Sequence, residues 1–169
     1  VDRHAQLVES WSPDAQQNYR AAFLAEENGA DVGRIAAGMK RVSAELLAQK
    51  RLKAPLEDGD PLAQGSPFSK TARRDIVAAA QTLRQVYNGV DARSDNARLE
   101  GPGLKRVLEE AAPDLHEELT ARLHDALEAA RAIPAPFHEA LQSDEGRQKI
   151  EQAADQFRAI GALLEDVAE

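Results

Sequence analysis

The sequence predicts an all-α fold, an up-down bundle of about four long helices with short extra helices. Hydrophobic residues make up 43% of the 169 residues but aromatic residues only 4%, so the core must consist mainly of Leu, Ile, Val and Ala. That composition suits close helix packing better than a sheet sandwich, which favours aromatic and β-branched residues. Apolar residues recur with a helical period, and no run shows the period-two alternation of a half-buried strand. The length predicts a single domain, residues 1–169.

Residues 1–25 are predicted to be helical with an internal joint. Ser12-Pro13-Asp14 is a helix-start signal: serine caps, proline suits the first helical position, and the acid lies at the positive end of the helix dipole. One kinked helix and two short helices would both fit. The apolar stripe of this segment consists of Leu7, Trp11, Ala15, Tyr19 and Ala22.

The second helix is predicted to start at Asp31 and to end at Ala54-Pro55. Aspartate is a good N-cap, and proline disfavours helix in the residue before it. The apolar residues alternate steps of four and three, the narrow stripe of a packed bundle: Ile35, Met39, Val42 and Leu46. Residues 56–68 are dense in Gly, Pro and Asp and are predicted to form a loop.

Ser69 is predicted to cap a third helix, and Gly89 to end it in the left-handed conformation common at helix C-termini. One apolar face of this helix is formed by Ile76, Ala79, Ala80, Leu83, Val86 and Tyr87. Residues 90–103 are predicted to be irregular. Long ordered loops of this kind are often functional or packed against a partner.

The rest of the chain is predicted to hold a short helix, a long helix, a break and a last long helix. The short helix has the apolar face Leu104, Val107, Leu108 and Ala111. Pro113-Asp114 opens the long helix, whose face is formed by Leu115, Leu119, Ala126, Leu127 and Ala130. Residues 133–136 break the pattern, and residues 137–141 add a turn or two. Ser143-Asp144 caps the last helix, with the stripe Ile150, Ala153, Phe157, Ile160, Leu164 and Val167.

Charge and composition exclude several classes of function. The net charge is −8, whereas nucleic-acid binders concentrate basic residues, so we expect no nucleic-acid partner. The absence of cysteine excludes disulfides, thiolate nucleophiles and cysteine-ligated metal sites. No apolar run approaches the roughly 20 residues that cross a bilayer, so we expect no transmembrane segment. No signal peptide is visible at Val1.

His124 is the histidine with the best-placed acids, because Glu117 lies seven residues before it and Glu128 four after it. The three would share a helical face, as metal ligands must. That face lies roughly opposite the apolar stripe, so we interpret His124 as a solvated residue beside acids. His4, His116 and His138 show no metal-ligand spacing. No cofactor is evident from the residues themselves.

Short motifs in a fixed order carry a family resemblance. Ser66-Pro67-Phe68-Ser69 is followed by Asp75-Ile76 and Val86-Tyr87-Asn88-Gly89. Trp11-Ser12-Pro13 and Lys53-Ala54-Pro55-Leu56 precede them, and Pro113-Asp114-Leu115 and Pro134-Ala135-Pro136-Phe137 follow. In order and spacing, the chain resembles the imelysin-like family of bacterial periplasmic proteins, once assigned as metallopeptidases and often tied to iron uptake.

The resemblance implies that the chain is the C-terminal half of an imelysin-like domain, the second of two packed helical bundles. The hallmark Gly-x-His-x-x-Glu motif of the first half does not occur in these residues. The resemblance makes Ser66, Ser69, Asp75 and Tyr87 candidate binding residues. Two family positions that tend to carry Glu and Asn are occupied by Gly65 and by residues 78–80, all alanine. Structural roles also fit: a helix cap for Ser69, an ion pair within its own helix for Asp75, and a core position for Tyr87.

We therefore expect an imelysin-like periplasmic or outer-surface protein, associated with iron or metal uptake, that binds rather than catalyses. The resemblance implies iron or another divalent or trivalent metal as ligand. As partners it implies a missing N-terminal half or second chain and components of iron uptake. One alternative is a metallopeptidase-related protein, which would need a metal-activated water and a base that these residues do not provide. The other is a structural or interaction bundle, which an exposed apolar stripe would favour.

Overall fold

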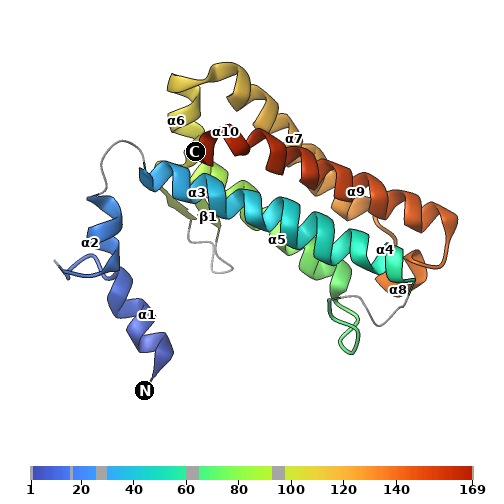
Figure 1. Ribbon diagram of the computed structural model, residues 1–169. Coiled ribbons are helices and arrows are strands. Elements are labelled where there is room, and N and C mark those ends of the chain that lie inside the picture. Colours follow the sequence, from blue (N-terminus) through green and yellow to red (C-terminus); the bar gives the residue numbers. More distant parts are fainter. Residues whose placement is uncertain (1, 16, 26–29, 60–64, 93–97, 169) are drawn as a thin grey trace.

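The computed structural model describes residues 2–15, 17–25, 30–59, 65–92 and 98–168. In these residues a rod formed by α3 (Ala30–Lys40), η1 (Arg41–Lys53) and α4 (Ala54–Asp58) lies beside α5 (Ala72–Asn88) and α9 (Asp144–Leu163) (Figure 1). The fourth long segment of the bundle is α7 (Pro113–Ala132). The helix α9 packs against η1 and α7, and α5 packs against α7 and η1, which closes the bundle. The predicted all-α helical bundle is confirmed.

The rod consists of α3 (Ala30–Lys40), η1 (Arg41–Lys53) and α4 (Ala54–Asp58). The segment η1 is π-helical, and at its end the Ala54 N–H donates to the carbonyl five residues back. Because a π-helix turns more widely than an α-helix, the buried positions in η1 are Ser43, Leu47, Ala48 and Leu52. The prediction that Leu46 faces the core is therefore wrong, and its side chain is 37% exposed.

Pro55 does not end the rod, contrary to the prediction. In an α-helix the proline ring clashes with the carbonyl four residues back. The wider π-helical turn before Pro55 leaves more space between the proline ring and that carbonyl. The Pro55 side chain is fully buried. The rod ends instead at Gly59, which has a left-handed φ of 65°.

The helix α5 (Ala72–Asn88) starts two residues later than predicted, because Thr71 and not Ser69 is its N-cap residue. Ser69 does not cap it, because the Ser69 hydroxyl lies 2.8 Å from the hydroxyl of Thr71, the residue that precedes the helix. Gly89 ends α5 as predicted, with a φ of 68° and its N–H bonded to carbonyls of the last turn. Val86 at the end of the predicted apolar face is 44% exposed.

Residues 90–100 contain a short antiparallel ribbon of β1 (Val90–Ala92) and β2 (Arg98–Glu100), where an irregular stretch was predicted. Strands of three residues are too short to show a period-two pattern. The ribbon returns the chain to the end of α5, where two glycines meet. A Cβ on Gly103 would lie 2.2 Å from the backbone nitrogen of Gly89, so only glycine fits there.

The C-terminal helices follow the predicted order. They are α6 (Leu104–Ala111), α7 (Pro113–Ala132), α8 (Phe137–Ala140), α9 (Asp144–Leu163) and α10 (Glu165–Ala168). Ser143 caps α9 as predicted, accepting a hydrogen bond from the Gly146 N–H at 3.1 Å. Gly146 also lets α8 approach, because a Cβ there would lie 2.2 Å from the backbone oxygen of Ala140.

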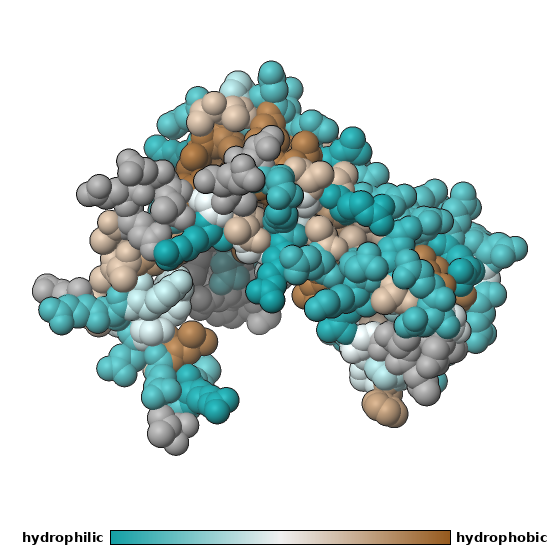
Figure 2. Space-filling model, viewed as in Figure 1, coloured by the Kyte–Doolittle hydropathy of each residue, from teal (hydrophilic) through white to brown (hydrophobic). Residues whose placement is uncertain are grey.

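The core lies inside the ring formed by the rod, α9, α7 and α5. Phe157 and Ile150 of α9, Leu52 of the rod and Leu119 of α7 are fully buried. The surface in the view of Figure 2 is mainly hydrophilic, with hydrophobic patches between the charged residues. Among the described residues, the buried polar or charged residue is Ser43, so the core of the bundle holds no charged side chain.

The N-terminal arm, residues 2–25, contains α1 (Arg3–Trp11) and α2 (Tyr19–Leu24) and lies apart from the bundle (Figure 1). It forms two short helices, one of the two forms predicted. The second helix is capped by Asn18, so the predicted start at residues 12–14 is wrong. The Asn18 amide also donates to the carbonyls of Glu9 and Ser12, which holds the connecting turn outside either helix.

Candidate functional site

The motif Ser66-Pro67-Phe68-Ser69 lies in the turn before α5 and folds onto the start of that helix. The Ser66 hydroxyl donates to Asp75 Oδ2 at 2.5 Å, and the Thr71 hydroxyl donates to the same oxygen at 3.0 Å. The hydroxyls of Ser69 and Thr71 lie 2.8 Å apart. The structure thus joins three of the four candidate residues, Ser66, Ser69 and Asp75, in one hydrogen-bond network that Thr71 completes.

The turn is also held by its backbone. The Lys70 N–H donates to the Ser66 carbonyl at 3.0 Å, and Lys70 has a left-handed φ of 56°. A non-glycine residue keeps that conformation only where the surrounding contacts hold it. The same turn displays Phe68, whose side chain is 96% exposed. An ordered polar turn therefore presents a large apolar ring to solvent.

A small pocket of about 110 Å³ lies between η1 and α5 beside this network. Asp75 and Arg51 contribute charged groups to its lining, and Leu47 and Ile76 contribute apolar ones. Gly65 lies against Arg51, because a Cβ at residue 65 would lie 1.6 Å from a guanidinium nitrogen. A carboxylate, hydroxyls and a guanidinium together can hold a polar ligand by hydrogen bonds.

Tyr87, the fourth candidate residue, lies at the other end of α5 and is 1% exposed. Its hydroxyl lies 2.7 Å from His116 Nδ1, donates to the His116 carbonyl at 3.2 Å and accepts from Thr120 at 3.4 Å. The rings of Tyr87 and His116 are stacked with centroids 6.1 Å apart. The structure therefore places Tyr87 in the contact between α5 and α7, separate from the network around Asp75.

Burial raises the pKa of the Tyr87 phenol, because the phenolate would lose its hydration. The hydrogen bond from Thr120 acts in the opposite direction, and the negative charge of Glu109 adds to the rise. Glu109 belongs to α6 and lies 3.6 Å from His116 Nε2. The phenol therefore stays in its neutral form, as a hydrogen-bonding group where α5, α6 and α7 meet.

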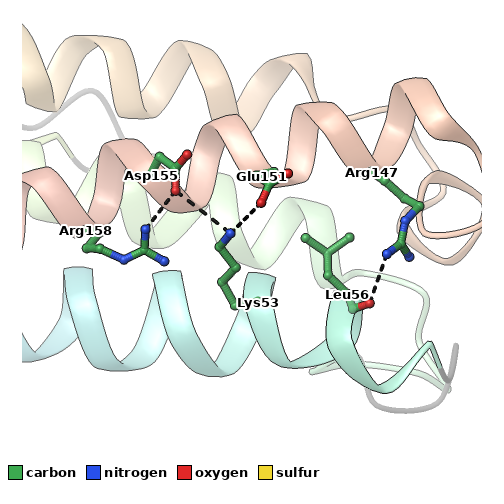
Figure 3. A network of polar contacts seen from close by, with 6 residues as sticks. All are labelled: Lys53, Leu56, Arg147, Glu151, Asp155 and Arg158. Atoms are coloured by element: carbon green, nitrogen blue, oxygen red, sulfur yellow. Dashed lines mark hydrogen bonds and ion pairs between the residues drawn. The ribbon is translucent and has the colours of Figure 1, made fainter.

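A second polar network joins the rod to α9 (Figure 3). Lys53 Nζ lies 2.7 Å from a Glu151 oxygen and 4.0 Å from an Asp155 oxygen, and Asp155 also bonds Arg158 at 2.9 Å. The hydrogen bond from Lys53 lowers the pKa of the Glu151 carboxyl. Nearer the start of α9, Arg147 donates to the carbonyl of Leu56 at 3.2 Å. The charges pair across the helix contact, so we assign this network to the docking of α9 on the rod.

Arg73 at the start of α5 binds the end of α7. Its Nε donates to the Ile133 carbonyl and its Nη2 to the Arg131 carbonyl, both at 2.6 Å. A cation at a helix C-terminus is favourable because the last carbonyls carry the negative end of the dipole. Arg73 therefore fixes the position of α5, and with it the position of the Asp75 network.

Within the described ranges, the remaining histidines form no metal site with their neighbours. His124 is exposed, and His138 lies 4.0 Å from a Glu139 oxygen. Among the residues that the structure describes, no group of three or more His, Cys, Asp or Glu side chains could hold a metal ion. The Asp75 network offers one carboxylate with hydroxyls, which is part of a ligand set for a hard cation.

Two features of this arrangement were missed by sequence reasoning. Thr71 precedes Asp75 by four residues, the spacing that places two side chains on one helical face, so this pair had a local signal. The contact between Tyr87 and His116 joins residues 29 positions apart and had none. The His116 side chain is only 16% exposed.

Comparison with known proteins identifies the sequence pattern. A protein-family model described as Imelysin matches residues 1–164 of the chain. The name of this model is that of a peptidase family. A search of curated proteins finds no match to the chain. In the described parts of the chain, none of the helices combines the length and the apolar character needed to cross a membrane.

Proposed function

Because this chain belongs to the imelysin family, we propose that it is a binding component linked to iron or another metal. The Ser66–Asp75 network is the polar part of its binding site. The observation that carries this proposal is the convergence of the Ser66 and Thr71 hydroxyls on one carboxylate oxygen of Asp75 beside a pocket. The family membership also supports a periplasmic or outer-surface location as part of the same proposal.

The chemistry of the network suits a hard cation, which prefers carboxylate and other oxygen ligands. Both hydroxyls bind Oδ2 of Asp75, and this fixes the orientation of the carboxylate. One carboxylate with hydroxyls is a partial ligand set. The remaining ligands would come from water, from residues outside the described ranges, or from a second polypeptide such as the N-terminal half of the domain.

Calorimetric titration with ferric, ferrous and zinc ions tests the proposal on the chain itself. Wild-type protein should bind at least one of these ions, and Asp75→Asn should abolish the heat of binding. Asp125→Asn is the matched control, because it removes an exposed carboxylate on α7, away from the network. No binding at about 1 mM ion, or equal binding by Asp75→Asn and wild type, would refute the proposed site.

A second candidate function, an interaction module, is favoured by the exposed ring of Phe68. An aromatic side chain on an ordered turn resembles the anchors that dominate protein interfaces. Phe68→Ser should then weaken binding of a partner such as the N-terminal half of the domain by at least about tenfold, measured by calorimetry. Val107→Ser, at another exposed apolar position, is the control and should bind as wild type does. Equal affinities for all three proteins would exclude Phe68 as an anchor.

A further inference from the structure

An apolar groove of about 460 Å³ runs along the surface between α3 and α5. Its walls include Ile35 and Val42 of the rod and Ala79, Leu83 and Val86 of α5. Val86 is 44% exposed, so the groove opens to solvent. We call this feature the α3–α5 groove.

Gly38 lies in the wall of this groove without a steric reason for being glycine. A Cβ on Gly38 would meet nothing within 4 Å, whereas a Cβ on Gly103 or Gly146 would meet backbone atoms at 2.2 Å. Glycine inside a helix is unfavourable relative to alanine, so a packing reason is expected. The position keeps space above α3 open for a bulky group that the bundle itself does not supply.

The N-terminal arm carries such groups. The ring of Trp11 lies 5.1 Å from that of Tyr19 and 5.8 Å from that of Phe23, which forms an aromatic cluster across α1 and α2. Trp11 is 45% exposed and Tyr19 52%, and none of the described side chains of the arm is buried. Two short helices that bury so little apolar surface gain little stability by themselves. The arm therefore has an apolar face that needs a partner.

We propose that the arm closes on the α3–α5 groove of its own chain, with the aromatic cluster filling the space above Gly38. Residues 25–29 join α2 to α3, a length within the range of about two to eight residues that connects neighbouring helices in bundles. About half of the surface of Trp11 and of Tyr19 is still exposed, so closure can bury part of the roughly 150–250 Å² that each such side chain buries when fully enclosed. A tethered contact can be smaller than the roughly 800 Å² per partner of an interface between separate chains. The tether keeps the arm at high local concentration beside this groove, which favours its own chain over a second copy.

Trp11 is the one tryptophan of the chain, so its fluorescence reports on the arm alone. In wild-type protein its emission should be blue-shifted and protected from a soluble quencher such as acrylamide. Gly38→Leu fills the groove and should shift the emission to the red and restore quenching. Gly38→Ala is the matched control, because it leaves most of the space open and should behave as wild type does.

Val86→Lys provides a second variant, on the α5 wall of the groove, and should expose Trp11 as Gly38→Leu does. Far-UV circular dichroism of each variant confirms that the bundle is folded. Equal emission and quenching in wild type and both groove variants would overturn the proposal. A blue shift that grows with protein concentration would also overturn it, because the arm would then bind a second copy rather than its own chain.

Discussion

Replacing Tyr87 by phenylalanine isolates the contribution of one buried hydroxyl. The ring, which is 1% exposed, would keep its packing, while the His116 carbonyl and the Thr120 hydroxyl would lose a partner. Leaving buried polar groups unsatisfied costs about 1–3 kcal/mol. Because the His116 side chain is 16% exposed and Thr120 is exposed, water can replace part of the loss, so we expect about 1–2 kcal/mol less free energy of unfolding. For a domain of this size that lowers Tm by about 2–8 °C.

Urea unfolding followed by circular dichroism measures this change, with Tyr19→Phe as the matched control. Tyr19 is the other tyrosine of the chain and is 52% exposed, so its variant should stay within about 0.5 kcal/mol of wild type. Equal unfolding free energies for Tyr87→Phe and Tyr19→Phe would refute the assignment of a stabilising role to the Tyr87 hydroxyl.

The raised pKa of Tyr87 adds an alkaline test of the same reasoning. The folded state holds the phenolic proton more tightly than the unfolded state, so the stabilisation is complete below the ordinary tyrosine pKa of about 10. It is lost as the pH rises through the higher folded-state pKa. Wild-type protein should therefore lose more stability than Tyr87→Phe above about pH 10. Absorbance titration of the Tyr19→Phe variant should show Tyr87 ionising above the ordinary tyrosine pKa of about 10, and ionisation at that value would contradict burial.

The remaining predictions concern four substitutions outside the Asp75 network. Arg73→Ala removes both guanidinium bonds to the end of α7 and should cost about 1–2 kcal/mol in urea unfolding, and a change below about 0.5 kcal/mol would contradict this. Gly146→Ala should cost at least about 1–3 kcal/mol, because its Cβ would meet a backbone oxygen at 2.2 Å. A Cβ at residue 38 would meet no atom within 4 Å, so Gly38→Ala should be neutral or stabilise the fold by up to about 1 kcal/mol. Equal changes in unfolding free energy for Gly146→Ala and Gly38→Ala would be inconsistent with this packing. Lys53 lowers the pKa of Glu151, so their pairing stabilises above the ordinary glutamate pKa of about 4.3 and is lost as the pH falls through the folded-state pKa. Lys53→Met should accordingly lose less stability on acidification, and a curve parallel to that of wild type would speak against the ion pair.

Helix ends were predictable where one residue satisfies the free backbone N–H or C=O groups and has no other hydrogen-bond partner nearby. Ser143 caps α9 and Gly89 ends α5 because each uses only local groups. The same reasoning failed where other partners were available. Ser69 contacts the Thr71 hydroxyl instead of capping a helix, and Asn18 provides the cap that was assigned to residue 12.

The candidate site was predictable in part. The contact of Ser66 with Asp75 is local in sequence, whereas the contacts of Tyr87 join distant helices. Ser66 and Asp75 are nine residues apart, and the turn between them can bring their side chains together. The surroundings of Tyr87 depend on α7, which follows in sequence only after the ribbon and α6. No local pattern indicates that His116 would lie against its hydroxyl. The motif thus identified the residues, and the packing separated Tyr87 from the others.

By itself the sequence determined the helical class, the order of the helices and the family, because apolar period, capping residues and motif order are properties of short stretches of chain. Only the tertiary structure decided that Leu46 faces solvent, that Pro55 lies within the rod and that Tyr87 is bonded to His116. Each of these depends on how distant segments pack: the π-helical turn of η1 changes which residues face α9, and the contact of α5 with α7 decides which polar groups meet.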